Sequence, residues 1–294
     1  MCLYPKIIQN RKYVANKKNG GIIPPFNDKR VLKVPIGCGK CMECRKQKSR
    51  EWQVRLQEEI RINKNGKFVT MSFNDEELLK IENEIKELEG YNRDNEVCRI
   101  GIRRFLERWR KKYKKSVRHW LVNELGQKNS ERVHIHGLIF TDKVEEIENI
   151  WKYGKVYIGE YVNAKTINYI VKYVSKGDEK HKEFVSKVYT SAGIGSGYVK
   201  RPDAKLNKYK GKETRETYIT REGVQLPLPI YYRNKIYNEE EREKLWLKKL
   251  DEEKRYVNGI EIDISKGEEE YYKVLEQERK KNKRLGFGND EFCV

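Results

Sequence analysis

The chain has 294 residues, of which 64 are Lys or Arg and 45 are Asp or Glu, giving a formal net charge of +19. This excess of cations favours a polyanionic partner such as nucleic acid, although solubility alone can also account for it. No apolar run approaches the roughly 18 residues needed to span a bilayer, and the start of the chain lacks the layout of a secretory signal. We therefore expect an intracellular protein of one to three domains that does not enter the membrane.

The first region, residues 1–66, begins irregularly and then carries a run of cysteines. A helix is expected from about Cys44 to Ile62, because Trp52, Leu56 and Ile60 recur every four residues. Lys and Arg crowd the first turns of this helix, where they oppose the helix dipole. Their position therefore favours a phosphate partner over helix stability.

Four of the six cysteines lie in this first region: Cys2, Cys38, Cys41 and Cys44. Their spacing can give a tetrahedral thiolate site for a structural Zn²⁺, with the first cysteine brought back by the intervening loop. Zinc would fix a polar segment that has little core of its own. An iron-sulfur cluster and free thiols are the alternatives. Cys98 and Cys293 lie apart from this group and are expected to be ordinary thiols.

Residues 67–200 show the alternation of strand and helix signals typical of a mixed fold. A strand at 68–73 ends at Asn74 and Asp75, which are good N-cap residues for a helix at 76–89. A basic amphipathic helix follows at about 99–115. The remaining expected elements are strands 117–125 and 132–140 joined by a turn at 126–131, a helix at 144–151, a strand at 155–161, a helix at 164–176 and a glycine-containing loop at 191–198.

Residues 201–294 form a charged extension rich in Lys and Glu. A Pro-interrupted apolar segment lies at 226–232, and we expect solvated helices with loose tails after about residue 238. The predicted fold class is α+β. A central antiparallel sheet would contain the 117–140 hairpin, and the 164–176 helix would pack across it.

Two histidines lie two residues apart in an otherwise apolar strand. His134 and His136 would project from the same face, about 7 Å apart along the strand, and can converge on one metal ion. A chance pair of core histidines has about the same weight on spacing alone. A partner motif is needed to separate the two interpretations.

The helix at 164–176 carries that partner motif. Tyr169, Tyr173 and Lys176 stand at i, i+4 and i+7, so two phenols and an ammonium would share one face. In a chain with 19 tyrosines, an ordinary amphipathic helix is the simpler interpretation when this helix is taken alone. Together the two motifs fit a mechanism in which a bivalent metal polarises a phosphodiester and a phenol attacks it. The ammonium could neutralise the phosphate or lower a phenol's pKa.

Three motifs in order resemble the replication initiators of small single-stranded DNA bacteriophages, the microviruses and especially gokushoviruses, within the HUH endonuclease superfamily. They are residues 68–75, the histidine motif at 134–136 and the two-tyrosine motif at 169–176. The resemblance implies the HUH endonuclease fold and nicking of the viral strand at the origin. It also implies a 5′-phosphotyrosyl intermediate and later joining in rolling-circle replication.

The resemblance also implies site roles. The family supplies a third metal ligand from a neighbouring strand, for which Glu124 is the candidate if the hairpin pairs residues whose numbers have an even sum. With an odd sum, Asn123 would take that place. Tyr173 is the first-ranked nucleophile, since it also matches the shorter motif of one-tyrosine relatives, and Tyr169 is the second. Mg²⁺ or Mn²⁺ is the expected catalytic metal.

The expected partners are single-stranded origin DNA of the chain's own genome and a host helicase and polymerase, in the cytoplasm of a bacterial host. Five basic residues are candidates for DNA contact: Lys172, Arg45, Lys48, Arg103 and Arg110. The alternatives are a relaxase or transposase of the same superfamily and a non-enzymatic, zinc-stabilised DNA-binding protein. The last would leave the paired His and Tyr without a role.

Overall fold

The computed structural model describes residues 2–126, 131–177, 180–181 and 184–288. It divides into two compact units. The sheet unit comprises Lys48–Lys176 and Phe184–Lys200. The terminal unit comprises Met1–Gln47, Gly177–Glu183 and Arg201–Val294. This division differs from the three consecutive regions expected from the sequence, since both ends of the chain contribute to one unit.

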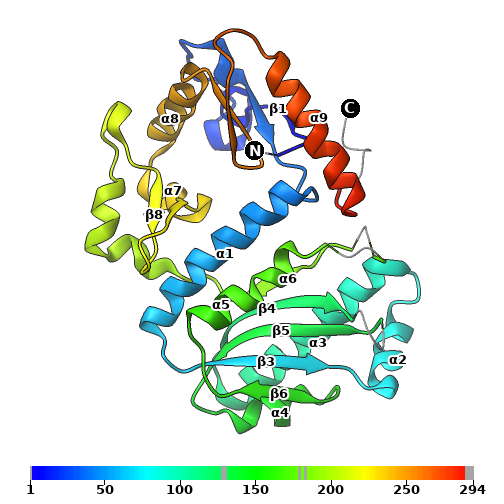
Figure 1. Cartoon of the computed structure of the whole chain (residues 1–294). Coiled ribbons are helices and arrows are strands. Elements are labelled where there is room, and N and C mark those ends of the chain that lie inside the picture. Colours follow the sequence, from blue (N-terminus) through cyan, green and yellow to red (C-terminus); the bar gives the residue numbers. More distant parts are fainter. Residues whose placement is uncertain (1, 127–130, 178–179, 182–183, 289–294) are drawn as a thin grey trace. The chain divides into compact units, whose positions relative to one another are not determined.

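The sheet unit is built on a five-stranded sheet with the order β6-β3-β5-β4-β7 (Figure 1). Its strands are β3 (Gly66–Ser72), β4 (Arg118–Leu125), β5 (Val133–Phe140), β6 (Val156–Gly159) and β7 (Val188–Thr190). Each neighbouring pair is antiparallel. The α+β prediction with a central antiparallel sheet is therefore confirmed, and the histidine strand β5 lies at its centre.

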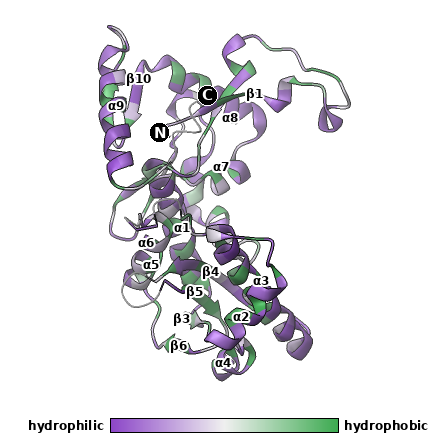
Figure 2. Cartoon of the chain, turned by 90° about the vertical axis from the view of Figure 1, so that its right-hand side faces the viewer, coloured by the Kyte–Doolittle hydropathy of each residue, from purple (hydrophilic) through white to green (hydrophobic). Residues whose placement is uncertain are grey.

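Alternate residues of the strands enter two separate cores, one on each face of the sheet. Val69 and Ile135 belong to the core that includes Phe105 and Trp109 of helix α3 (Gly90–Tyr113). Helices α2 (Asp75–Glu84) and α4 (Glu145–Trp151) contribute to the same core. Figure 2 shows hydrophilic and hydrophobic residues side by side along α3, as expected for an amphipathic helix.

The other face of the sheet packs against α1 (Met42–Ile62), α5 (Ala164–Ile170) and α6 (Lys172–Ser175). Trp120 and Leu138 meet Leu56 and Ile170 there, and all four side chains are fully buried. The tyrosine-bearing segment is thus fixed to the sheet by apolar contacts. This core is what places the two tyrosines above the histidine strand.

Several element boundaries differ from the sequence prediction. Helix α3 begins at Gly90, well before residue 99, and α2 ends at Glu84. The single helix expected at 164–176 is two short helices joined at Val171. The N-cap prediction is correct, because the side chain of Asn74 accepts a hydrogen bond of 2.8 Å from the Glu77 N–H. The predicted turn of the hairpin falls largely on residues 127–130, which lie outside the described residues.

The terminal unit contains three two-stranded sheets. These pair β1 (Lys6–Gln9) with β2 (Lys33–Ile36), β8 (Thr217–Ile219) with β9 (Gln225–Pro227), and β10 (Lys254–Val257) with β11 (Ile260–Asp263). Its helices are the start of α1, α7 (Ile230–Ile236), α8 (Glu239–Asp251) and α9 (Glu269–Arg284). Short 3₁₀ turns occur in the chain at Arg11–Tyr13, Lys17–Asn19, Lys29–Leu32, Ser196–Lys200, Pro202–Asn207 and Gly211–Glu213.

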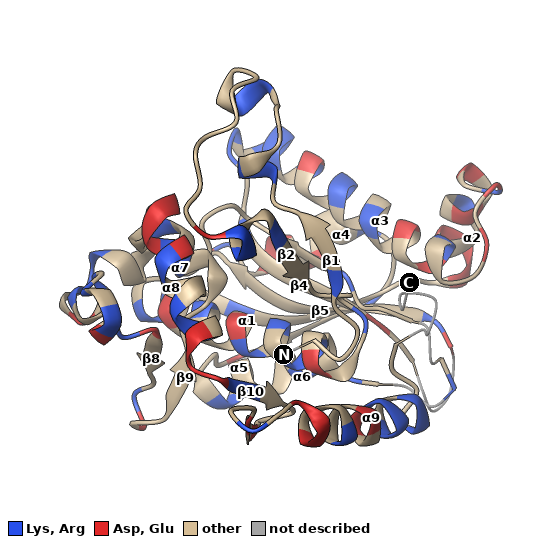
Figure 3. Cartoon of the chain, turned by 90° about the horizontal axis from the view of Figure 1, so that it is seen from above, with Lys and Arg blue, Asp and Glu red and all other residues tan. Residues whose placement is uncertain are grey.

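The expectation of loose tails after residue 238 is wrong for the part of the chain that the structure describes. Leu245, Val257, Ile262 and Leu275 are all buried. Lys or Arg and Asp or Glu alternate along α9 (Figure 3), so the composition of this region reflects exposed helix faces that surround a small core. No helix within the described ranges is both long and apolar enough to cross a membrane.

A buried carboxylate links three parts of the sheet unit. Glu59 of α1 is 3% exposed and accepts hydrogen bonds from Arg118 Nη2 at 2.8 Å and from the Gly195 N–H at 2.7 Å. Burial alone would raise the pKa of Glu59, but these donors hold it below its ordinary value. The ionised carboxylate therefore ties α1 to β4 and to the glycine-containing loop.

We predict that Glu59→Gln lowers the free energy of unfolding by about 1–3 kcal/mol, because it leaves buried donors with a weaker acceptor. The folded-state pKa is depressed, so this stabilisation is present above the ordinary value of 4.5 and is lost as the pH falls through the folded pKa. Urea unfolding of parent and variant at neutral and acid pH measures both effects. Glu107→Gln, which removes an exposed partner of Arg103, serves as the control and should have little effect.

Candidate functional site

Strand pairing brings a carboxylate, two imidazoles and a hydroxyl to one face of the sheet. Glu124 pairs with His134, and Thr70 pairs with His136. Directly paired residues of an antiparallel sheet project on the same side. The register of β4 and β5 is therefore the even-sum one. Asn123 is fully buried on the other face, where its side chain donates to Asn95 at 2.8 Å.

His136 is held by a contact at each ring nitrogen. Its Nδ1 lies 3.0 Å from Thr70 Oγ1, and its Nε2 lies 3.1 Å from Glu124 Oε2. The other oxygen of Glu124 accepts a hydrogen bond of 2.6 Å from Lys176 Nζ. Burial would raise the pKa of Glu124, but the bonds from His136 and Lys176 hold it below its ordinary value. The face therefore presents an ionised carboxylate.

The two tyrosines meet directly above this face. The Tyr173 hydroxyl donates to the Tyr169 hydroxyl at 2.7 Å, so the i, i+4 spacing brings both phenols to one point although the helix is interrupted between them. The Tyr173 ring stacks on the His136 ring, with centroids 4.2 Å apart and planes inclined by 7°. Tyr173 is 9% exposed and Tyr169 is 51% exposed. Each phenol has a different access to solvent.

The electrostatic environment keeps the Tyr173 phenol protonated in the isolated chain. Burial, the hydrogen bond to Tyr169 and the negative charge of Glu124 all raise its pKa. Lys176 Nζ lies 6.0 Å from the ring centroid and is engaged by Glu124. Its charge is therefore partly offset by Glu124 before it reaches the phenol.

The donor set on this face fits a divalent metal ion. Burial and the neighbouring His136 lower the pKa of His134, which favours the neutral imidazole that can bind a metal. His134, His136 and Glu124 together offer two nitrogen donors and one oxygen donor from adjacent strands. In the described part of the chain, only the four cysteines form a group of three or more such ligands with all atoms within 4.8 Å of one another. The ligand atoms of the histidine face are spaced more widely.

The four cysteines of the first region come together in the terminal unit, as expected from their spacing. Cys98 lies apart from them and is fully buried in the core between α3 and the sheet. Cys293 lies outside the described residues.

The five basic residues expected to contact DNA do not form one surface. Lys172 and Lys48 are exposed, and Lys172 lies directly before Tyr173. Arg103 and Arg110 are exposed on α3, which packs on the face of the sheet opposite the histidines. Arg45 is 3% exposed, so its assignment to a DNA surface is corrected: its guanidinium is buried near the cysteine group.

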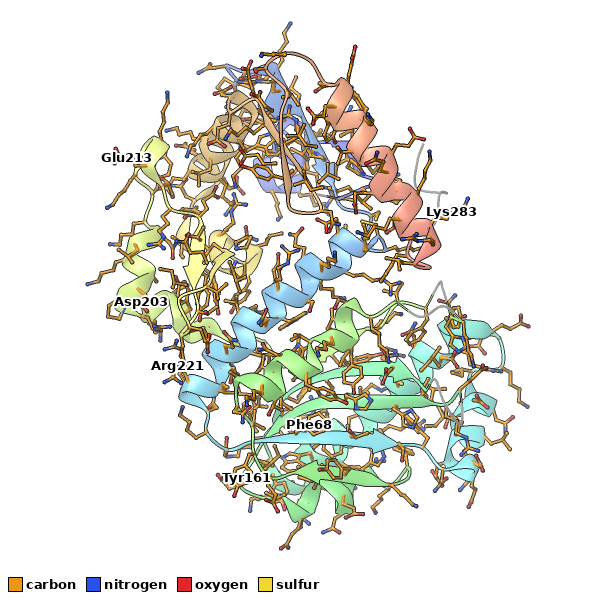
Figure 4. All side chains as sticks on the ribbon, in the orientation of Figure 1. Phe68, Tyr161, Asp203, Glu213, Arg221 and Lys283 are labelled. Atoms are coloured by element: carbon orange, nitrogen blue, oxygen red, sulfur yellow. The ribbon has the colours of Figure 1, made fainter. Side chains whose placement is uncertain are left out.

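Sequence reasoning gave no role to two features of this face. Thr70, inside the first motif, orients His136. The aromatic strip, which we define as Phe68, Tyr157 and Tyr169, lies beside the tyrosine pair. The Phe68 ring contacts the rings of Tyr157 and Tyr169 at centroid distances of 6.3 and 6.2 Å. Figure 4 shows Phe68 on β3. The alternation of Phe68 with Thr70 along this strand was the available signal.

Gly137 lies between His136 and Leu138 where β4 passes very close. A Cβ atom at Gly137 would collide with the Trp120 carbonyl oxygen and would lie 2.8 Å from Leu121 Cα. Both are backbone atoms and cannot move without displacing the strand. Glycine therefore allows the tight pairing of β4 and β5 that sets the position of the histidines.

Residues 66–178 match a family model that describes replication-associated proteins of the ORF2 type. This segment begins at β3 and runs past α6, so it includes the histidine face and both tyrosines. The replication-associated protein ORF2 of Spiroplasma virus 4 is 27% identical to this chain over 231 residues, which is 67% of this chain and 69% of that protein. No solved structure matches significantly. The two likenesses support a viral replication protein.

We predict that Gly137→Ala destabilises the chain by about 1–3 kcal/mol or more, because the added methyl group collides with backbone. Gly159→Ala in the edge strand β6 is the matched control, since its Cβ would meet only side-chain atoms of Phe68, at 3.3 Å or more. Thermal unfolding measures both variants. Equal melting temperatures for the two variants would show that the close approach at Gly137 does not constrain the strand pair.

Proposed function

We propose that this chain is a replication initiator endonuclease that nicks the viral strand at the origin and rejoins it in rolling-circle replication. The observation that carries the proposal is the Tyr173 ring stacked on His136, beside the Glu124 carboxylate and within hydrogen-bonding distance of a second phenol. The match of residues 66–178 to a replication-associated family supports the same conclusion.

The reaction is a transesterification at phosphorus. The Tyr173 oxygen attacks the scissile phosphate, a P–O bond to tyrosine forms, and the P–O3′ bond breaks. The phenol gives up its proton, and the leaving 3′ oxygen gains one. The products are a 5′-phosphotyrosyl linkage and a free 3′-hydroxyl. Stacking on His136 fixes the phenol before attack, which lowers the entropic part of the barrier.

Tyr169 provides a second acceptor for the joining step. Its hydroxyl lies 2.7 Å from that of Tyr173, so both phenols can reach one scissile phosphate without a large movement. When a second copy of the origin is cut by Tyr169, the released 3′-hydroxyl can attack the first phosphotyrosine. That attack restores the Tyr173 phenol and closes a DNA circle.

His134, His136 and Glu124 would hold the divalent ion, for which we propose Mg²⁺ or Mn²⁺. When bound, the ion would polarise a phosphate oxygen and stabilise the charge that develops in the transition state. Thr70 fixes the ring orientation of His136 through Nδ1, which leaves Nε2 directed towards Glu124. Lys176 is positioned through Glu124 to place a positive charge near the phosphate.

The aromatic strip offers a path for single-stranded DNA up to the tyrosines. Tyr157 is 63% exposed and Tyr169 is 51% exposed, and Phe68 joins them through ring contacts. Exposed rings in a row can stack unpaired bases whatever their sequence. Lys172, exposed on α6, would contact the phosphate backbone beside the tyrosines. A host helicase and polymerase would complete replication.

Tyr173→Phe is predicted to abolish covalent capture of a single-stranded origin oligonucleotide in the presence of Mn²⁺, because it removes the attacking oxygen. The adduct is measured by denaturing gel electrophoresis. Tyr157→Phe, which removes a hydroxyl from the same face but retains the ring, serves as the control and should form the adduct at the parental level. A full-strength adduct with Tyr173→Phe would overturn the ranking of the two tyrosines.

Tyr157→Ala is predicted to weaken binding of single-stranded DNA about 5- to 150-fold, the equivalent of losing one base stack worth about 1–3 kcal/mol. Fluorescence anisotropy with a labelled oligonucleotide at fixed salt measures the Kd. The matched control is Tyr272→Ala on α9, where the ring is 57% exposed but lies outside the strip. If both variants bind with the parental Kd, the strip is not part of the DNA path.

A further inference from the structure

A second site, unrelated to the histidine face, lies in the terminal unit. The sulfur atoms of Cys2, Cys38, Cys41 and Cys44 all lie within 4.8 Å of one another. The set combines a residue near the start of the chain with three residues around the start of α1. No step of the proposed nicking reaction uses these sulfurs.

The sulfur spacing has the size expected for a tetrahedral metal site. Cys2 Sγ lies 3.9 Å from Cys41 Sγ, and Cys38 Sγ lies 4.0 Å from Cys44 Sγ. Four sulfurs placed about 2.3 Å from a zinc ion in a tetrahedron would be about 3.8 Å apart. A disulfide requires about 2.05 Å. All four cysteines are free thiols in the structure.

Backbone N–H groups converge on these sulfurs. Tyr4 N and Cys38 N donate to Cys2 Sγ at 3.3 and 3.2 Å, and Cys41 N donates to Cys38 Sγ at 3.3 Å. Gly39, between Cys38 and Cys41, adopts a φ of 74°, which lets this short turn close. Donors aimed at sulfur orient the ligands and stabilise thiolate charge.

Arg45 supplies a buried positive charge to the same place. Its side chain is 3% exposed, and its guanidinium interacts electrostatically with Cys41 and Cys38. The guanidinium is fixed by a hydrogen bond of 3.0 Å from Nε to the Lys40 carbonyl and lies 5.2 Å from the centre of the Phe287 ring. Zn²⁺ with four thiolates carries a net charge of −2, so a buried cation beside it offsets part of the cost of burying that charge.

The cysteine group also lies where the two ends of the chain are joined. Met42 N donates to Asn282 Oδ1 at 2.8 Å, and Arg279 Nε donates to the Leu3 carbonyl at 2.9 Å. Both partners belong to α9, at the far end of the sequence. The apolar core here is small and includes Leu3, Met42 and Leu275, with the cysteines packed against it. A core of this size benefits from a further cross-link.

We propose that Cys2, Cys38, Cys41 and Cys44 bind one structural Zn²⁺, that Arg45 balances the charge of the site, and that the ion holds the terminal unit together. Zinc fits because four thiolates in a closed tetrahedral set leave no open position for a substrate. Binding energy at such a site adds directly to folding stability.

The first test is the metal content of the full chain, purified without added metal and measured by inductively coupled plasma mass spectrometry. We expect one zinc per chain in the parent and a substoichiometric amount in Cys41→Ser. Cys98→Ser is the matched control and should retain one zinc, because its sulfur lies in a different core. A variant with both His134→Ala and His136→Ala should also retain one zinc, which separates this site from the proposed nuclease site.

A second measurement covers the case in which Cys41→Ser fails to fold. Exchange of the parent's metal for Co²⁺ should give the intense absorption typical of tetrahedral thiolate coordination, and a zinc chelator should lower the melting temperature. Iron with visible cluster absorption, or a parent free of zinc whose melting temperature is unchanged by chelator, would overturn the proposal.

The role of Arg45 has a separate test. Arg45→Met, which retains the length of the side chain but not its charge, should weaken zinc affinity about 10- to 100-fold, the range found for outer groups that support metal ligands. Lys46→Met removes an exposed charge from the next position and should leave the affinity unchanged. Competition with a zinc-binding dye measures both. Equal affinities for the two variants would remove Arg45 from the site.

Discussion

The register between β5 and its two neighbours is the constraint on which the candidate site depends. Pairing of Glu124 with His134, and of Thr70 with His136, brings a carboxylate, a hydroxyl and two imidazoles to the face that the tyrosines cover. A shift of one residue would turn His134 and His136 into the apolar core under α3 and bring Ile135 to the site. The tight approach at Gly137 and the burial of alternate residues in two separate cores both oppose such a shift.

The two faces of the sheet divide the work between stability and chemistry. The face under α3 is covered by buried apolar side chains. The other face is covered by α1, α5 and α6 over β4 and β5, while Tyr157 of the edge strand β6 stays exposed. The helical segment therefore serves twice: its apolar residues anchor it, and its tyrosines reach over the edge of the covered area. Charge alone would not have located this region, since exposed Lys and Arg also lie on α3, away from the site.

The sequence predicted the parts of this arrangement that depend on local patterns. The alternation in residues 133–140 predicted a buried strand with both histidines on one face, and the i, i+4 spacing predicted the meeting of Tyr169 with Tyr173. Features set by long-range packing were not predictable in the same way. Helix α3 starts earlier than its amphipathic pattern suggested, Arg45 is buried against the cysteines, and α9 packs with the start of the chain. Each depends on a contact between residues far apart in the sequence. The metal ligands and the identity of the nucleophile stay predictions.

Peptide mapping of the covalent DNA adduct tests the central claim most directly. The unmodified chain would be incubated with Mn²⁺ and single-stranded DNA of the replicon that encodes it, then digested and analysed by mass spectrometry. The account predicts a nucleotide phosphate linked to Tyr173, with a smaller amount at Tyr169. DNA that is bound but never cut, or an adduct at a residue outside this pair, would contradict it.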